Sequence, residues 1–154
     1  MHNGLSRRTV LFAAIGLAQP PLLLARQGVA IEVSKDPGCG CCEGWIAHLR
    51  SNGFDASAID TSDMSAVKKR LGVPPALASC HTATIDGYVI EGHVPAIAIR
   101  QLLATRPRIT GLAAPGMPIG SPGMEGGTPE VYDVVAWAPG TQTVFGRYRG
   151  ADPV

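Results

Sequence analysis

The chain has 154 residues, a formal net charge of +1 and only 5% aromatic residues. Removal of the N-terminal segment that carries Arg7 and Arg8 takes away at least these two positive charges and lowers the net charge from +1 to about −1 or below. A charge so close to zero, with no basic stripe, excludes nucleic acid as an expected partner. About 125 residues remain after that segment, which is enough for one hydrophobic core and too few for two.

The N-terminus has the pattern of an export signal, which we place at residues 1–28. The arginine pair precedes an apolar stretch, Val10–Ala18, that is too short to cross a bilayer as a helix of about 20 residues. The pair also fits a twin-arginine signal, so the general secretory route and the route for folded proteins both stay open. We therefore predict an exported protein with one domain at residues 29–154 and no membrane contact after signal removal.

The domain is predicted to begin with a strand, a cysteine-rich loop and a helix. Val29–Val33 alternates and is rich in β-branched residues, which predicts a strand that runs directly into the loop. After the loop, Trp45, Ile46 and Leu49 have helical spacing, and Gly53 stands where a helix C-cap belongs.

A second strand and a second helix are predicted next. Phe54–Ile59 has the composition of a short strand. A helix should follow, capped by Asp60 or Thr61, continuing through Leu71 and ended by Gly72.

A β-hairpin and a third helix complete the predicted core. His81–Ile85 and Tyr88–Glu91 are joined by Asp86-Gly87, a strong two-residue hairpin signal, and Pro95 opens the helix that follows. This order of strands and helices is that of a thioredoxin-like α/β fold.

The C-terminal part is predicted to add a second hairpin to that core. Val131–Trp137 and Thr143–Tyr148 have high β propensity and flank the turn Pro139-Gly140. The Gly- and Pro-rich stretch Gly111–Gly127, which precedes this hairpin, is expected to form a loop.

Three cysteines, Cys39, Cys41 and Cys42, lie within four residues in a Gly- and Pro-containing loop, and the only other cysteine is Cys80. Packing gives no reason to cluster thiols in a loop. The start of the following helix favours thiolates, because its unpaired N–H groups and macrodipole attract negative charge. We expect all four cysteines to converge on one site.

Several chemistries fit such a cluster. A disulfide framework is disfavoured because it would leave most of the domain without a cross-link, and adjacent cysteines pair only through a strained ring. Adjacent cysteines also suit a zinc knuckle poorly, whereas thiolates shared between several ions suit Cu(I). Cys39 and Cys42 have C-x-x-C spacing, so a thiol-disulfide oxidoreductase is an open alternative. An iron-sulfur site is another open alternative.

Histidine and methionine extend the candidate ligand set. His81 adjoins Cys80, and His93 lies between a predicted strand and a predicted helix. Pro-Gly-Met occurs twice, ending at Met117 and Met124, and thioethers are soft ligands. His48, within the first helix, is expected to be structural.

The sequence resembles the bacterial CopG-type copper-resistance family from Ile31 to about Tyr148. The resemblance rests on four stretches, C-G-C-C-E-G-W, G-V-P-P-A-L-A-S-C-H-T-A, I-D-G-Y-V-I-E-G-H-V-P-A and G-L-A-A-P-G-M-P-I-G-S-P-G-M-E. It implies a thioredoxin-like fold, a periplasmic location and copper binding by cysteines, with a role in resistance that includes a change of copper's oxidation state. Ala114 stands where the family more often has Val.

The resemblance and the residues together predict a thiolate-bridged site for several Cu(I) ions. The expected ligands are Cys39, Cys41, Cys42, Cys80, His81, His93, Met117 and Met124. The expected partners are copper ions and other periplasmic copper-handling proteins. No residue is assigned a catalytic role, because the chain has no nucleophile elbow, phosphate-binding loop or paired carboxylates.

Overall fold

The structure is a computed structural model that describes residues 28–154, so the predicted export signal lies almost entirely outside the described residues. Its elements in chain order are β1 (Val29–Lys35), α1 (Gly40–Ser51), β2 (Phe54–Asp60), α2 (Met64–Arg70), a short 3-10 helix (Pro75–Leu77), β3 (Thr82–Ile85), β4 (Tyr88–Gly92), α3 (Ala96–Thr105), β5 (Gly111–Ala114), β6 (Val131–Ala138), β7 (Thr141–Arg149) and β8 (Asp152–Pro153). The strands form one sheet in the order β2-β1-β3-β4-β5-β6-β7-β8.

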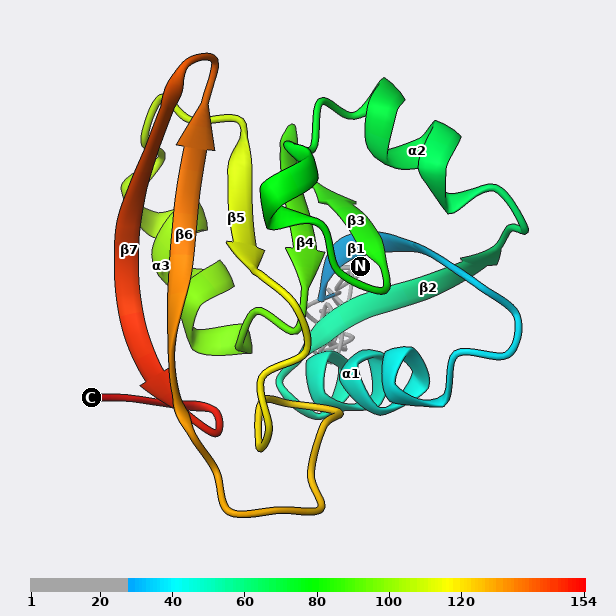
Figure 1. The fold of residues 1–154 in the computed structure, drawn as a ribbon, viewed down its shortest axis with the longest axis vertical. Coiled ribbons are helices and arrows are strands. Elements are labelled where there is room, and N and C mark those ends of the chain that lie inside the picture. Colours follow the sequence, from blue (N-terminus) through cyan, green and yellow to red (C-terminus); the bar gives the residue numbers. More distant parts are fainter. Residues whose placement is uncertain (1–27) are drawn as a thin grey trace, which may run out of the picture.

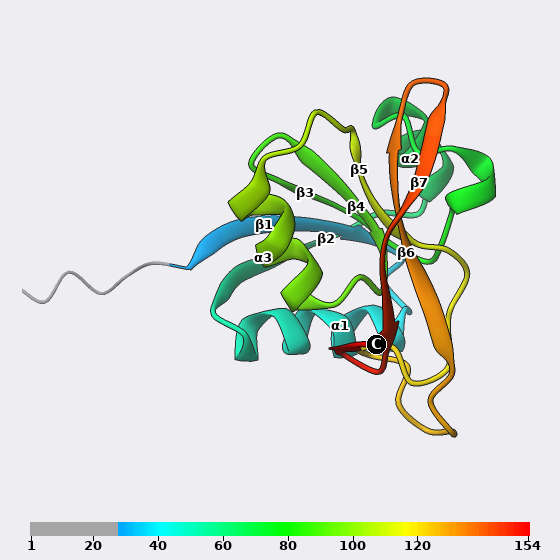
Figure 2. The same cartoon turned by 90° about the vertical axis from the view of Figure 1, so that its left-hand side faces the viewer.

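The first four strands of the sheet and the three α-helices have the predicted thioredoxin-like arrangement. β1 pairs in parallel with β2 and antiparallel with β3, and β3 forms the predicted hairpin with β4. Helices α1 and α3 lie on one side of the sheet and α2 lies on the other (Figure 1, Figure 2). The predicted fold class is therefore confirmed.

The predicted cap of α2 was wrong. Asp60 still belongs to β2, where it pairs with Lys35 of β1, and the N–H of Thr61 donates to the Lys35 carbonyl. The cap is Asp63, whose side chain accepts the N–H of Ala66 at 2.9 Å. Continued pairing with β1 extends β2 and moves the start of the helix along the chain.

A strand that was not predicted joins the C-terminal hairpin to the core. β5 lies within the stretch expected to be a loop, and it pairs in parallel with β4 and antiparallel with β6. All four of its residues are buried. The predicted hairpin is present as β6 and β7, and β5 makes it part of the same sheet rather than a separate layer.

The core lies between the sheet and the pair α1 and α3, and it fixes the start of α1. Trp45, Ile46 and Leu49 of α1 are fully buried, as the helical spacing predicted. The indole N–H of Trp45 also donates to the Val94 carbonyl, which precedes α3, at 2.8 Å. Burial of these side chains, worth about 1.5–3 kcal/mol each, holds the first turn of α1 against the end of β4.

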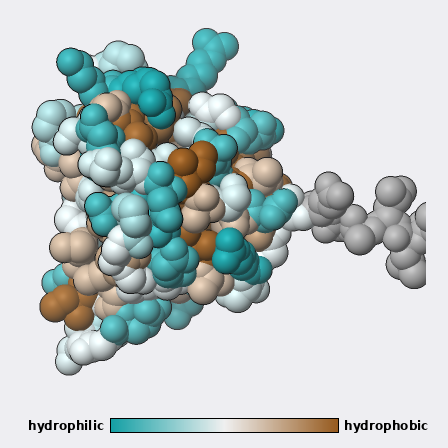
Figure 3. All heavy atoms as spheres, turned by 90° about the vertical axis from the view of Figure 1, so that its right-hand side faces the viewer, coloured by the Kyte–Doolittle hydropathy of each residue, from teal (hydrophilic) through white to brown (hydrophobic). Residues whose placement is uncertain are grey.

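The surface on the side of β2 is largely hydrophilic. Figure 3 shows this face, on which hydrophobic residues form small groups separated by polar ones. None of the helices within residues 28–154 is long and apolar enough to span a membrane.

Candidate metal centre

The cysteine loop is held by its own turn and by an ion pair. Cys39 is the N-cap of α1, and its N–H donates to the carbonyl of Asp36 at 3.1 Å. Lys35, whose side chain is only 2% exposed, binds Glu43 in the first turn of α1 and Asp60 at the end of β2, each at 2.8 Å. These carboxylates raise the pKa of Lys35, through hydrogen bonds to Asp60 and then Glu43. The loop is thereby fixed to the ends of β1 and β2.

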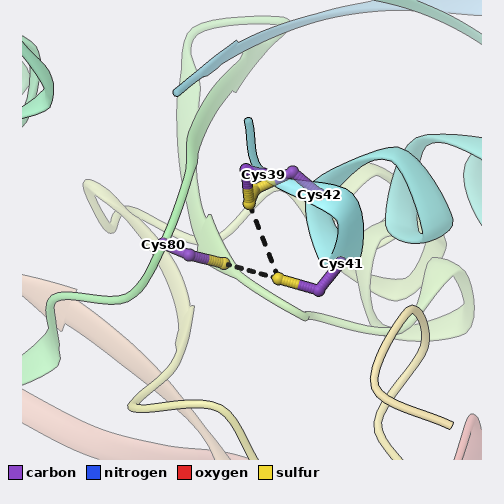
Figure 4. A group of neighbouring side chains, drawn as sticks. All are labelled: Cys39, Cys41, Cys42 and Cys80. Carbon is purple, nitrogen blue, oxygen red and sulfur yellow. Dashed lines mark hydrogen bonds between the residues drawn. A yellow bond between two sulfur atoms is a disulfide. The ribbon is translucent and has the colours of Figure 1, made fainter. Parts of the chain in front are cut away.

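The four cysteines converge, as predicted. Their sulfur atoms all lie within 4.8 Å of one another, with Cys80 approaching the start of α1 from the loop before β3 (Figure 4). The Sγ of Cys41 lies 3.5 Å from the Sγ of Cys39 and 3.8 Å from that of Cys80. Cys39 and Cys42 form a disulfide, so Cys41 and Cys80 are the free thiols in this state. Four thiolates become available only when that bond is reduced.

Two buried imidazoles contact the sulfur of Cys80. The Cys80 sulfur lies 3.1 Å from Nε2 of His93 and 3.3 Å from Nδ1 of His81, and these three residues form a second group able to hold a metal ion. The Nδ1 of His93 is 2.8 Å from the Pro122 carbonyl, which can only accept. The proton of His93 therefore lies on Nδ1, and the lone pair of Nε2 faces Cys80.

His81 has a ring nitrogen without a hydrogen bond. Its Nε2 is buried and, within residues 28–154, is the one buried side-chain nitrogen or oxygen atom that lacks a partner. The ring packs 4.3 Å from the Trp45 ring and 5.0 Å from the His93 ring, measured between centroids. His81 thus has an unpaired nitrogen, contacts the Cys80 sulfur through Nδ1 and packs on a second imidazole, and sulfur and imidazole are the donors that soft or borderline metal ions prefer.

Burial keeps Cys80, His81 and His93 uncharged in the metal-free protein. It lowers the pKa of His81 well below the usual range, with the positive forms of His93 and Lys68 adding to the effect, and it also lowers the pKa of His93. Burial, together with the nearby Cys41, raises the pKa of Cys80 to about 11. Cys80 is thus a thiol at neutral pH, and a metal ion that binds it must displace a proton.

A buried carboxylate fixes the backbone on both sides of Cys80. Glu91 of β4, which has no exposed surface, accepts the N–H of Ser79 at 2.6 Å and the hydroxyl of Thr82 at 2.7 Å. Lys68 of α2 neutralises it, with Nζ 2.5 Å from the carboxylate. Ser79 and Thr82 bracket Cys80 and His81, so this ion pair helps to set where both side chains lie.

Both Pro-Gly-Met turns contact the site through their backbones. The carbonyl of Gly116 accepts the hydroxyl of Ser79, and the carbonyl of Pro122 accepts the His93 proton. The side chain of Met117 is 55% exposed and that of Met124 is half-buried. The structure thus places both turns beside the cluster, but the hydrogen bonds that hold them there come from residues next to the methionines.

Several residues at the site were not among the predicted site residues. These are Trp45, Lys68, Glu91 and the backbone of Pro122. His48 has the structural role that was expected, because its Nε2 accepts the N–H of Ala96 at the start of α3 at 3.1 Å.

The fold and the cluster define a class of protein, a thioredoxin-like domain with a cysteine and histidine group able to bind metal. Two solved structures described as copper resistance protein CopG, form 1 and form 2, are each 50% identical to this chain. Form 1 has a TM-score of 0.74, with 80% of this chain and 99% of that one covered. Form 2 has a TM-score of 0.75, with 79% and 98% covered. The chain belongs to the CopG family.

Two further comparisons add detail to this assignment. A family model described as a protein of unknown function, DUF411, matches residues 77–124. This segment contains Cys80, both cluster histidines and both Pro-Gly-Met turns. No curated protein matches the chain.

Proposed function

We propose that this chain is a periplasmic copper-resistance protein that binds Cu(I) in a thiolate-bridged site for several ions. The observation that carries the proposal is the convergence of four sulfur atoms within 4.8 Å, with two buried imidazoles on Cys80. Soft thiolates prefer Cu(I), and adjacent cysteines on a helix start suit sulfurs shared between ions. The relatives described as copper resistance proteins support the same metal.

Each kind of donor has a proposed role. Cys39, Cys41, Cys42 and Cys80 would supply bridging thiolates after reduction of the disulfide. His93 would bind through Nε2, the nitrogen whose lone pair faces the cluster. His81 would bind through Nδ1, which lies 3.3 Å from the Cys80 sulfur. Met117 and Met124 would reach the site from the two Pro-Gly-Met turns. The Cys39–Cys42 disulfide supports cycling between Cu(I) and Cu(II), because oxidation of its two thiols would release two protons and two electrons, enough to reduce two Cu(II) ions to Cu(I).

Copper binding is tested with reduced, metal-free protein under anaerobic conditions. Titration with Cu(I), followed by removal of weakly bound metal, should leave more than one copper ion per chain. X-ray absorption at the copper edge should report sulfur ligands and a short copper–copper distance. A triple variant with Cys39, Cys41 and Cys42 changed to Ser should lose this binding, and binding that survives in the variant would contradict the proposal.

A matched pair of histidine variants separates ligands from structural residues. His93→Gln removes the imidazole that faces Cys80, whereas His48→Gln removes one that accepts a backbone N–H at the start of α3. We expect His93→Gln to weaken Cu(I) binding about 10- to 100-fold and His48→Gln to leave it unchanged. Equal losses in both variants would assign the effect to folding.

The Cys39–Cys42 disulfide favours one second candidate function, a thiol-disulfide oxidoreductase that uses this pair. The pair lies at a helix start, as in C-x-x-C enzymes. The metal-free protein would then reduce insulin with turnover and have a potential between about −270 and −120 mV. Absence of turnover, together with tight Cu(I) binding, would leave copper handling as the function.

The periplasmic location rests on residues 1–28, of which only Gly28 is among the described residues. Fractionation of cells that express the full chain should place it in the periplasm. Changing Arg7 and Arg8 to Lys should block export by the twin-arginine route and leave general secretion unaffected. If both the unchanged chain and the Lys variant stay in the cytoplasm, the proposed location is wrong.

A further inference from the structure

We propose that Cys41 and Cys80 are a second redox pair, so that the chain stores four electrons in two dithiols. Both are free, half-buried thiols, and their sulfur atoms lie 3.8 Å apart (Figure 4). Cys39 and Cys42 already form the first pair. This inference concerns the same sulfurs as the proposed copper site, but its chemistry needs no copper.

Closure of the second bond requires little movement. A disulfide has an S–S length of about 2.05 Å, so the two sulfurs must approach by roughly 1.8 Å. Cys41 is fixed in the first turn of α1, whereas Cys80 lies in a bend before β3 begins. Side-chain rotation and a small shift of this bend would bring the Cys80 sulfur to Cys41.

The alternative pairings are less favourable. Pairing Cys41 with Cys42 would need the strained ring of adjacent cysteines. Pairing Cys41 with Cys39, whose sulfur is 3.5 Å away, would break the existing bond and leave Cys42 and Cys80 to pair. The pairing of Cys39 with Cys42 and of Cys41 with Cys80 keeps the observed bond and joins the remaining two sulfurs.

The reaction with a small disulfide, RSSR, balances in two steps. The Cys41 thiolate attacks RSSR, which forms a Cys41–SR bond, breaks the S–S bond of RSSR and releases one RS⁻. The Cys80 sulfur then attacks Sγ of Cys41 and releases the second RS⁻, while the Cys80 proton passes to Nε2 of His93, 3.1 Å away. Two thiols lose two electrons and two protons, and RSSR becomes two RSH.

The second bond would change what the site can hold. With both pairs oxidised, a covalent bond would join α1 to the loop before β3, and all four thiolates would be lost as ligands. With only the first pair oxidised, Cys41 and Cys80 would remain beside two imidazoles. Thiol oxidation would thus set the metal capacity of the site in two steps of two electrons.

The test uses reduced, metal-free protein and excess oxidised glutathione. Intact mass spectrometry should show a loss of four hydrogen atoms, since each disulfide removes two. Non-reducing digestion with trypsin should join the peptides 36–50 and 71–100. This link should persist in the double variant Cys39→Ser, Cys42→Ser, where only Cys41 can form it, and should disappear in Cys41→Ser. A loss of only two hydrogens, or a link from Cys80 to Cys39 or Cys42, would overturn the proposal.

Variants keep the result interpretable. The double variant Cys39→Ser, Cys42→Ser lacks the first pair and should still form the link between Cys41 and Cys80. Cys80→Ser should stop at the loss of two hydrogens, and His93→Gln should slow the second bond without affecting the first. Failure of Cu(I) binding alongside formation of both bonds would reject the proposed function and leave this inference standing. The reverse result would reject only the inference.

Discussion

The Nδ1–H of His93 donates to the carbonyl of Pro122 at 2.8 Å, and this bond joins the second Pro-Gly-Met turn to the imidazole that faces Cys80. The next residue in that turn, Gly123, lies against the first turns of α1, so the same short segment contacts both halves of the site. The turn therefore orients His93 and also limits the position of the cysteine helix.

Gly123→Ala should destabilise the protein and disturb the site. Gly123 has φ +86°, and a Cβ there would lie 2.5 Å from the Cys41 carbonyl oxygen and 2.6 Å from the Trp45 nitrogen. We expect the free energy of unfolding to fall by about 1–3 kcal/mol because Ala adopts this backbone conformation poorly, and to fall further because the new Cβ would clash with α1. The measurement is urea unfolding, together with Cu(I) affinity.

Gly116→Ala is the matched control for this change. Gly116 has a similar φ of +71°, but a Cβ there would meet nothing within 4 Å. It should show the conformational loss and keep Cu(I) affinity. Equal effects in the two variants would mean that the contact of Gly123 with α1 is unimportant.

Glu91→Gln should lower both stability and Cu(I) affinity. The change leaves the largely buried ammonium of Lys68 without its carboxylate and weakens the acceptor for the Ser79 N–H. Breaking a buried ion pair costs about 3–5 kcal/mol, and displaced ligands bind metal about 10- to 100-fold more weakly. Thermal unfolding and competitive Cu(I) titration give the two quantities.

The double variant Lys68→Met, Glu91→Leu separates stability from positioning. Replacing a buried pair by apolar residues is often neutral, so we expect stability to recover. The Ser79 N–H would still lack its acceptor, so Cu(I) affinity should stay low. Recovery of both quantities would show that the ion pair supports folding alone.

The metal-free protein should become less stable as the pH falls from 7 to 5. Burial lowers the pKa values of His48, His81 and His93 in the folded state. The unfolded chain, with histidine pKa values near 6.5, binds more protons below that pH, so stability is present above about 6.5 and declines toward the lower folded values. A urea midpoint that stays constant over this range would contradict the expectation.

Met117→Leu and Met124→Leu together test the thioethers. Leu keeps the apolar volume, so the melting temperature and the number of reactive thiols should not change. If the sulfurs bind, Cu(I) affinity should fall about 10-fold or more. Unchanged affinity would limit these turns to the backbone contacts made by Gly116 and Pro122.

Sequence reasoning works well for the parts of this site that local chemistry defines. The cysteines at the start of α1 follow from a strand, a Gly- and Pro-containing loop and a helix in succession. Cys80, 38 residues beyond Cys42, could be placed beside them because the predicted fold brings its loop to that helix. The sequence left a redox pair of Cys39 and Cys42 as one alternative, because cysteine spacing does not determine whether a disulfide is formed.

Strand β5 and the buried Glu91 depend on contacts with residues that are distant in the sequence. β5 is Gly-Leu-Ala-Ala, with no β-branched residue, and is a strand because β4 and β6 pair with it on both sides. Glu91 would be read as an exposed residue of a hairpin, but every residue of β4 is buried. Its role becomes visible only once Lys68 of α2 lies beside it.

Trp45 packs its indole on the ring of His81, with 4.3 Å between centroids, while Trp137 lies in a separate cluster with Val73 and Leu77. The chain has only these two tryptophans. Because their surroundings differ, intrinsic tryptophan fluorescence should report on the site. Copper bound there should quench the fluorescence of Trp45 and leave that of Trp137 as an internal reference. Occupancy could then be followed without any added dye.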